Sequence, residues 1–540
     1  MAAYGVTVVH ATNVKPGPPG RTPPKRRPPK RRPPGLHRYR LVLPVPPRDD
    51  EKYTYIKRNL GYLTVVVTLG FLAATVSQTW FEYSSGMWPF AIFTAAGVAS
   101  FGLSLPLSFA GRGFDLLAHQ RRVRAWAPDI YPDVDIYLPV CGEPLEVLRN
   151  TWTGVWELVQ AYQGIARPYV LDDAADPDAR ELATSFGFGH VIRDNRPWMK
   201  KSGNLRYAFA RTIGEFILIL DADFAPRPDF LAETLPYFDD RQIAVVQTPQ
   251  FFRTSRQQTW VERAAGAVQE VFYRNVQVAR DRLDASICVG TCAVYRRTAL
   301  EPEGGTTLIA YAEDVHTGLD ARRNGWKVIY VPVLLATGMC PDNVDAFVRQ
   351  QYRWCTGSTS TILTSRLWTV PMTLRARLTY VSGFCYYLQT ALAIFAVPLF
   401  PLCLLLFRPH TITPENSRLI LVAICASMVL VPLWNICNYR PRDVVPLLTV
   451  RGWAHALAIW DYLRRKTMAW QASGSGVSQV RRFRVGVAVW NLGTAAAWLS
   501  LAVWRTAEYR SAQFVIVLAL GLCYAAGAVR ILIPPRKTVS

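Results

Sequence analysis

Four short strings along the chain carry side chains that could do chemistry together. Three of them hold pairs of acids: Asp172 with Asp173, Asp221 with Asp223, and Glu313 with Asp314. The fourth string, residues 350–354, reads Gln-Gln-Tyr-Arg-Trp and offers a cation beside an aromatic face. Such groups could hold a divalent cation, bind a phosphorylated ligand and accept a proton. Their order along the chain therefore predicts one composite site.

Asp221 and Asp223 form the clearest of these pairs. They follow the apolar run Ile-Leu-Ile-Leu at 217–220, so both carboxylates leave a buried strand and can turn toward one cation. Mg²⁺ and Mn²⁺ prefer carboxylates together with substrate phosphates, and the cation would neutralise the charge on a departing diphosphate. Surface loops carry many such pairs, but the position after a buried strand favours a metal site.

Two further groups lie where helices are expected to begin. Asp314 opens a helical pattern at 314–324, where the helix N-terminus would keep the carboxylate ionised and able to take a proton from a hydroxyl. Lys201 opens another helix, close to where a phosphate would bind. An ordinary first-turn acid and a solvated lysine are the alternatives. Trp354 could stack on a sugar ring or anchor the chain at a membrane.

Alternating strands and helices must position these side chains. We expect a helix at 146–162 and apolar strands at 134–139, 168–172, 215–220, 243–247 and 328–331. Continuous apolar strands separated by helices imply a mostly parallel sheet covered on both faces. Ligands of such sheets bind beyond the carboxyl ends of the strands, which is where the acids of the first two strings fall.

The remaining apolar residues form membrane-length runs. Half of the 540 residues are hydrophobic and the formal net charge is +22. Six segments lack Asp, Glu, Lys and Arg, namely 60–81, 83–111, 378–407, 419–439, 485–504 and 511–529. Because a crossing needs about 20 apolar residues, we expect six membrane helices; a buried core helix is the alternative for any single run. The basic flanks place both termini and the stretch from 112 to 377 in the cytoplasm.

The basic N-terminal repeat and the cysteines say less about function than the acidic strings do. The repeated Pro-Pro-Lys-Arg-Arg at 23–32 predicts an extended, disordered tail. It serves either as a topology signal without a partner or as a weak contact with anionic lipid. The ten cysteines include no Cys-x-x-Cys pair, so we expect buried free thiols in place of a metal site or a disulfide framework.

The strings, taken in order, resemble the processive family 2 glycosyltransferases, especially bacterial cellulose synthase catalytic subunits. The resemblance runs from about residue 137 to residue 354. It includes the Glu143-Pro144 turn, the string Gln-Thr-Pro-Gln-Phe-Phe at 247–252 where the family has His in fourth place, and Val289-Gly290-Thr291 where it has Cys-Gly-Ser. It implies a cytoplasmic α/β domain of the GT-A (Rossmann-like) type combined with an all-α transmembrane bundle of about six helices.

The resemblance also implies a role for each residue. Asp314 would be the general base, and Asp221 and Asp223 would bind Mg²⁺ or Mn²⁺. The donor nucleotide sugar would be held by Asp172, Asp173, Glu143, Lys201, Asp221, Gln350 and Arg353. The acceptor would meet Trp354, Glu313, Gly290 and Thr291.

Several positions depart from the family pattern. Ala174 stands where Gly is usual, Ala312 where Thr is usual, Gln250 where His is usual and Val289 where Cys is usual. None of these changes removes a chemical group that the mechanism requires, but they leave the sugar and the linkage open. The family's Phe-x-Val-Thr-x-Lys gating loop is not found. A shorter gating loop with Trp470, Ser473 and Gly474 is one reading of residues 470–474, and a plain interfacial linker is the other.

The expected organisation follows the chain from end to end. It comprises a disordered tail at 1–52, two transmembrane helices at 53–111, the GT-A domain at 112–345 and interfacial helices with the Gln-x-x-Arg-Trp string at 346–377. Two further membrane helices at 378–439, an interfacial helix and gating loop at 440–484, two last membrane helices at 485–534 and a cytoplasmic tail at 535–540 complete it.

The predicted function is a processive, inverting glycosyltransferase of the plasma (inner) membrane. It would polymerise a β-glucan, cellulose with β-1,4 linkages, from UDP-glucose and move it across the bilayer. The alternatives are another β-linked polysaccharide (mixed-linkage glucan, mannan, chitin- or hyaluronan-like), a non-processive lipid-linked sugar transferase, or a non-catalytic scaffold. The partners would be UDP-glucose, the growing polysaccharide, membrane lipids and an extracytoplasmic or cell-surface protein; neither nucleic acid nor a cyclic-dinucleotide domain is expected.

Overall fold

A computed structural model describes residues 42–56, 62–110, 113–416, 418, 440–466 and 479–533. The tail before residue 42, the expected membrane segment at 419–439 and the gating-loop residues Trp470, Ser473 and Gly474 lie outside the described residues. All described residues belong to one compact unit that begins at Val42.

A seven-stranded sheet has the strand order β3-β2-β1-β4-β7-β6-β8. Its strands are β1 (Val134–Val140), β2 (Ala166–Asp172), β3 (Gly189–Val191), β4 (Phe216–Ile219), β6 (Ile243–Gln247), β7 (Ala293–Arg296) and β8 (Lys327–Tyr330). All neighbours are parallel except β7, which runs antiparallel to both β4 and β6. A small antiparallel pair, β5 (Ala225–Pro226) and β9 (Ala336–Thr337), lies apart from it.

The two faces of the sheet are covered by different helices, as the apolar strands predicted. On β4, Phe216 and Leu218 belong to one buried cluster, whereas Ile217 and Ile219 belong to another. The first cluster contains Trp152 of α4 (Leu145–Ala161), which is 0% exposed. The expected mostly parallel sheet, with five of its strands near their predicted positions, is confirmed; β3 and β7 were not predicted.

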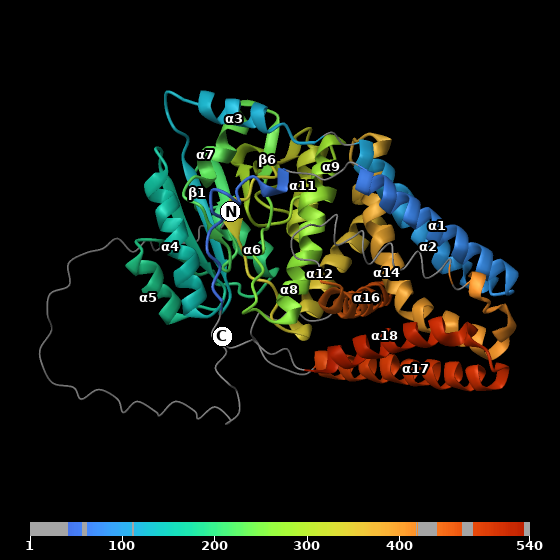
Figure 1. Cartoon of the computed structure of the whole chain (residues 1–540). Helices are drawn as coiled ribbons and strands as arrows, with labels where there is room; N and C mark the ends of the chain where they lie inside the picture. Colours follow the sequence, from blue (N-terminus) through green and yellow to red (C-terminus); the bar gives the residue numbers. More distant parts are fainter. Residues whose placement is uncertain are drawn as a thin grey trace, which may run out of the picture. The chain divides into compact units, whose positions relative to one another are not determined.

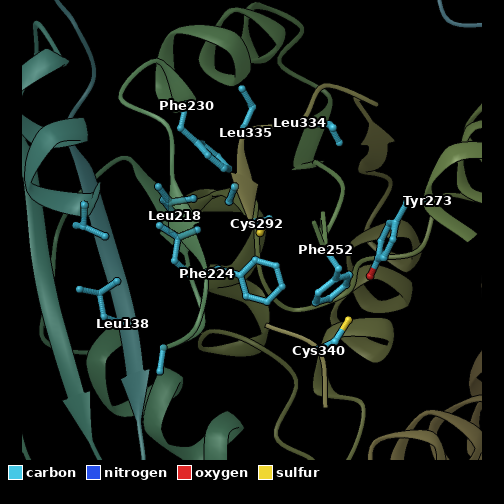
Figure 2. Packing of buried hydrophobic residues seen from close by; sticks show 14 of the residues in the cluster. Leu138, Leu218, Phe224, Phe230, Phe252, Tyr273, Cys292, Leu334, Leu335 and Cys340 are labelled. Atoms are coloured by element: carbon cyan, nitrogen blue, oxygen red, sulfur yellow. The ribbon is translucent and has the colours of Figure 1, made fainter. Parts of the chain in front are cut away.

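The first cluster also fixes the loop that follows β4. Figure 2 shows Phe224 and Phe252 side by side, and their ring centroids are 5.6 Å apart. Phe224 is 4% exposed. A Cβ on Gly338 would overlap the Phe224 ring, so position 338 admits no residue larger than glycine. Burying such an aromatic side chain contributes roughly 1.5–3 kcal/mol, which anchors the residues just before it in the chain.

The remaining helices of this region surround the sheet (Figure 1). They are α3 (Leu116–Ala125), α5 (Pro177–Ser185), α6 (Lys200–Phe209), α7 (Phe230–Thr234), α8 (Trp260–Val271), α9 (Gln277–Arg282), α10 (Arg297–Leu300) and α11 (Glu313–Arg323). A π-helical turn, Phe272–Val276, joins α8 to α9.

Long apolar helices form the other part of the unit. Among the described residues, three helical segments are long and apolar enough to cross a membrane: Leu374–Phe407, Phe483–Tyr509 and Ala512–Leu532. They belong to α14 (Leu374–Phe407), α17 (Gln479–Tyr509) and α18 (Val515–Leu532). The first two expected runs form α1 (Tyr62–Ser84), of 23 residues, and α2 (Ala91–Ala110), of 20 residues.

Two helices connect the sheet region to these apolar helices. α12 (Val344–Leu363) packs along α16 (Pro441–Leu463), and Tyr352 donates to Asp461 Oδ2 at 3.1 Å. Near the start of α16, the buried Asp443 pairs with Arg263 of α8 and Arg530 of α18, each at 3.1 Å. This group of one carboxylate and two guanidinium groups connects the sheet region to the last apolar helix.

Candidate active site

The candidate site lies at one edge of the sheet because of strand direction. Asp172 ends β2, and Asp221 follows β4 by two residues, so both lie at the carboxyl edge of the parallel strands. β7 runs the opposite way, so the residues just before it, Gly290 and Thr291, reach the same edge. The Thr291 hydroxyl accepts a hydrogen bond from the Asp221 N–H at 2.8 Å. An antiparallel strand therefore brings two distant strings together.

Asp172 is occupied by the turn that follows it. Its carboxylate, 0% exposed, accepts hydrogen bonds from the backbone N–H groups of Ala174, Ala175 and Asp176 at 2.8 to 2.9 Å. His190 lies 3.2 Å from its second oxygen. Although burial alone would raise the pKa of Asp172, these hydrogen bonds lower it, so the residue is a fixed anion.

Asp173 has a different partner. Arg193 donates from Nε and Nη2 to the two carboxylate oxygens of Asp173, each at 2.7 Å. The Arg193 side chain is 0% exposed. This bidentate pair neutralises Asp173 and holds its carboxylate in one orientation. Each carboxylate oxygen of Asp173 accepts one hydrogen bond from Arg193 and can accept a further one from a ligand.

Lys201 is the central cation of the site. Its Nζ donates to Asp221 Oδ1 at 2.5 Å and to the carbonyl oxygen of Gly290 at 2.8 Å. Although burial opposes its charge, Asp221 and Glu313 raise the pKa of Lys201. A permanently charged ammonium between two strings of the site suits a ligand that carries phosphate.

Asp314 lies against Gly290 at the start of α11. A Cβ on Gly290, whose φ is +75°, would come within 2.9 Å of Asp314 Oδ2. The residue before α11, Ala312, is left-handed with a φ of 54°. A Cβ on Gly357 of α12 would lie 2.5 Å from the Ala312 side chain. α12 therefore packs directly on the turn that presents Asp314.

Two carboxyls of the site ionise with difficulty. Burial, followed by the charge of Glu313, raises the pKa of Asp314 to about 7. Burial, followed by the charges of Asp221 and Glu143, raises the pKa of Asp223 to about 7. Burial and the charge of Glu313 therefore oppose the effect of the helix N-terminus, which was expected to keep Asp314 ionised.

The string at 350–354 lies in the middle of α12 and reaches the same site. Burial lowers the pKa of Arg353, while Asp221 and Glu313 act in the opposite sense. Within the described part of the chain, Arg353 forms no ion pair, and the side-chain oxygen of Gln350 is buried without a partner. Trp354 is 36% exposed. These side chains remain available for a ligand.

The acids fit a divalent cation only with help from a ligand. The described residues contain no group of three or more His, Cys, Asp or Glu side chains that could hold a metal ion. Asp221 and Asp223 supply two carboxylates. Burial and then the charge of Asp221 raise the pKa of Asp223, and a cation would offset both effects. Mg²⁺ and Mn²⁺ sites in proteins are often completed by substrate phosphates, so the donor set fits.

Two residues of the site were missed by sequence reasoning. Gln247, 0% exposed, clamps the loop before β7: it accepts from the Val289 N–H at 2.9 Å and donates to the Thr291 carbonyl at 2.8 Å. Its place in the Gln-Thr-Pro string was the available signal. Arg193 gave no sequence signal, because its partner Asp173 lies 20 residues away. The eight cysteines that the structure describes are free, but only four of them are buried and Cys523 is exposed, so the expectation of buried thiols is wrong for half of them.

Comparisons with known proteins show what the chain is similar to. Residues 216–434 match the family model described as glycosyl transferase family group 2. Cellulose synthase 1 of Komagataeibacter xylinus is 32% identical over 307 residues, which is 55% of this chain and 19% of that protein. The cellulose synthase catalytic subunit [UDP-forming] of Pseudomonas fluorescens (strain SBW25) is 32% identical over 244 residues, 44% of this chain and 33% of that protein.

Among solved structures, the mannosyltransferase PcManGT from Pyrobaculum calidifontis, in complex with GDP-Man and Mn²⁺, matches with a TM-score of 0.39 and 15% identity. It covers 82% of this chain and 98% of that one. A TM-score this low carries no argument about function.

The family match covers residues 216–434, less than half of the chain, and makes this part of the chain similar to glycosyltransferases. The chain is also similar to the catalytic subunits of cellulose synthase over about half of its length. The matches extend over no more than a third of the length of these two relatives.

Proposed function

We propose that the chain is a membrane-embedded, processive, inverting glycosyltransferase that polymerises a β-glucan, in the first instance β-1,4-linked cellulose from UDP-glucose, and translocates it. The observation that carries the proposal is the position of Asp314. Its carboxylate lies against Gly290, beside the Lys201–Asp221 pair, where α12 also brings Arg353. A base, a diphosphate site and an acceptor site thus share one edge of the sheet.

The donor would bind along the carboxyl edge of the sheet. Asp172, Asp173 and Glu143 hold the nucleoside part in this proposal, because they cluster at the end of β2 and the turn after β1. Lys201, Arg353 and the amide of Gln350 hold the diphosphate. One of the two relatives reported above supports a UDP-linked donor, since it is named UDP-forming.

Asp314 acts as the general base in the proposed reaction. The terminal hydroxyl of the acceptor loses its proton to Asp314 as its oxygen bonds to C1 of the donor sugar. The bond between C1 and the phosphate oxygen breaks, and UDP leaves with the electron pair. One displacement inverts an α-linked donor to a β-linked product. Holding base, acceptor and donor together supplies much of the rate.

Asp221 and Asp223 would hold Mg²⁺ or Mn²⁺ beside the diphosphate. When bound, the cation stabilises negative charge on the leaving group. Lys201 keeps Asp221 oriented through the 2.5 Å contact. Phe224, buried next to Asp223, fixes the same loop. Lys201 and Phe224 therefore hold the two carboxylates in place before a cation binds.

The acceptor would lie on Gly290, Thr291, Glu313 and Trp354. Gly290 has no side chain, so its backbone lies directly against Asp314, and the proposed acceptor site is beside this contact. Trp354, 36% exposed, offers an aromatic face. We place the apolar helices in the plasma (inner) membrane as a multi-pass bundle of about six helices, with both termini and the sheet region in the cytoplasm, and with the domain boundaries expected above.

Membrane lipids and an extracytoplasmic partner protein belong to this proposal. The three apolar helices among the described residues support the membrane location. The positive-inside rule supports the orientation, because the segment before residue 60 and the segment 440–484 carry many basic residues.

A direct assay tests the proposed function. The purified protein is placed in lipid vesicles with single labelled nucleotide sugars and a divalent cation, and any insoluble product is digested with linkage-specific glucanases. Labelled polymer from UDP-glucose that a β-1,4-glucanase degrades supports the proposal. Transfer of single sugars to lipid, or no transfer from any nucleotide sugar, contradicts it.

A second candidate is the synthesis of another β-linked polysaccharide. It is favoured by two departures from the family pattern that touch each other: Gln250 donates to the carbonyl oxygen of Val289 at 3.4 Å, next to Gly290. A changed acceptor contact could select another sugar or linkage. The same assay separates the two candidates, because each labelled sugar is offered alone.

A further inference from the structure

The buried side chain of Arg193 uses every donor that a guanidinium has. Nε and Nη2 donate to Asp173 at 2.7 Å each, and Nη2 also donates to the carbonyl of Lys200 at 2.9 Å. Nη1 donates to the carbonyl of Trp198 at 2.5 Å and to Asn195 Oδ1 at 3.3 Å. A guanidinium offers five N–H groups in a planar fork, and a lysine offers three from one atom. No other side chain can make this set of contacts.

The two carbonyls that Arg193 binds enclose an unfavourable turn. Met199 and Lys200 are left-handed, with φ angles of 51° and 49°. Consecutive left-handed residues other than glycine persist only where their surroundings hold them. Met199 is also the N-cap of α6 and receives no side-chain capping bond. Arg193 therefore holds this turn from inside the protein, together with the Ser202 hydroxyl, which donates to the Met199 carbonyl at 2.9 Å.

The turn leads directly to Lys201. This residue lies in the first turn of α6, and its Nζ contacts Asp221 at 2.5 Å and Gly290 at 2.8 Å. The helix packs closely on the guanidinium, because a Cβ on Gly203 would lie 2.5 Å from Arg193 Nη1. A shift of Arg193 therefore moves the start of α6, and Lys201 with it.

We propose that Arg193 is a positioning residue for the donor. One side of its guanidinium fixes Asp173, at the nucleoside end of the site, and the other side fixes the turn that places Lys201 at the diphosphate end. This inference rests on the proposed function, which assigns those two ends to a nucleoside diphosphate. Arg193 touches no substrate; it sets the spacing between two groups that do.

The test measures UDP binding to the full-length protein in lipid nanodiscs with Mn²⁺ present. Arg193→Lys keeps a positive charge beside Asp173 but cannot reach both carbonyls. The Kd for UDP is expected to rise roughly tenfold, the usual effect of losing a charged hydrogen bond. Lys201→Met raises the Kd as well. In the double variant the added loss is expected to be well below tenfold, because the part of the effect that passes through Lys201 is already gone and only the part through Asp173 remains.

Two further variants serve as a control and as a substitute for Arg193→Lys. Arg206→Lys on the same helix is the matched control: Arg206 binds only the exposed Gly304 carbonyl, at 3.1 Å, and the Kd should not change. Gly203→Ala presses on Arg193 Nη1 and on the Trp198 carbonyl that Arg193 binds, without removing a buried charge, so it perturbs this contact if Arg193→Lys does not fold. It should raise the Kd for UDP in the same way.

The outcomes separate the two proposals. A wild-type Kd in Arg193→Lys or in Gly203→Ala, or losses that multiply in the double variant, overturns the role of Arg193. A wild-type protein that binds UDP but makes no polymer overturns the proposed function alone. A wild-type protein that binds no UDP overturns both.

Discussion

Gly290 and Asp314 touch across the site: the backbone of the first leaves no space for a side chain beside the carboxylate of the second. A Cβ on Gly290 would lie 2.9 Å from Asp314 Oδ2 and 3.0 Å from its Cβ. These residues come from a loop before β7 and from the start of α11, so two distant parts of the chain meet at the proposed base. In the proposed reaction the acceptor hydroxyl approaches Asp314 beside this contact.

Gly290→Ala is expected to abolish transfer. The new methyl group displaces Asp314 and occupies acceptor space, and the left-handed backbone costs about 1–2 kcal/mol. Gly187→Ala is the matched control, because Gly187 has a similar φ of +72° but nothing within 4 Å of its Cβ. Sugar incorporation and the thermal midpoint are measured for both. Equal loss of activity in the two variants would assign the effect to backbone strain and remove the proposed role of Gly290.

Asp314→Asn should abolish polymer formation and leave the fold intact. Removal of a general base costs on the order of 10²- to 10⁴-fold in rate. The folded protein should not lose stability near neutral pH, because the amide ends the repulsion from Glu313 that, after burial, raises the pKa of Asp314. The turnover rate and the thermal midpoint are measured beside Glu181→Gln, an exposed change on α5. Unchanged synthesis in Asp314→Asn removes the assigned base.

The rate should fall as the pH drops through neutrality. The pKa of Asp314 is raised to about 7, and the base works only when deprotonated. At pH 6 roughly a tenth of such a group is ionised, so kcat/KM should be roughly tenfold lower than its plateau. The measurement is a pH profile from 5.5 to 8.5 with saturating cation. A flat profile down to pH 5.5 contradicts the assignment.

A divalent cation should stabilise the folded protein, and more so at higher pH. The pKa of Asp223 is raised to about 7 in the folded state, above its usual value. The folded state therefore binds more protons than the unfolded one in that window, and its stability falls as the pH rises through it. Cation binding reverses this loss; at 100 times its Kd a ligand contributes about 2.7 kcal/mol.

Thermal midpoints with and without Mn²⁺ at pH 6 and pH 8 test the cation site. Asp223→Asn should remove the Mn²⁺ effect, whereas Asp194→Asn, an exposed change in the loop before α6, should keep it. If Asp223→Asn responds to Mn²⁺ like the wild type, the cation binds elsewhere.

Arg353→Lys should weaken donor binding more than it slows chemistry. Arg353 has no ion-pair partner within the described ranges, and its nearest charges are those of Asp221 and Glu313. Loss of a guanidinium contact to a diphosphate should raise the KM for the donor roughly tenfold. Arg375→Lys, exposed at the start of α14, is the control. A KM that matches the control would place the diphosphate away from α12.

The sequence predicted those parts of the fold that depend on local pattern. The run before Asp221 is apolar and β-branched, so the strand and the acids after it could be placed directly. β7 could not, because its four residues, Ala293–Arg296, show no periodicity. The position of Gly290 therefore rested on the resemblance to a family, and the structure supplies its physical reason: an antiparallel strand returns the chain to the same edge.

The ionisation of the site was beyond sequence reasoning for a different reason. A helix N-terminus carries only about half a positive charge, while the pKa of Asp314 depends on its burial and on the position of Glu313. Burial is a property of the whole fold. The same holds for Asp173, whose charge is cancelled by Arg193 from another loop.

The direction of β7 also determines where the protein chain can accept inserted residues. The helix directly after it, Arg297–Leu300, lies at the opposite edge of the sheet, where Arg297 binds the carbonyl of Gly214 and the carboxylate of Asp135. Extra residues inserted into the exposed turn at Glu301–Glu303 leave the chemistry undisturbed, whereas a single insertion between Val289 and β7 slips Gly290 away from its partner. Natural variation in length should therefore gather on the side of the sheet that faces away from the sugar.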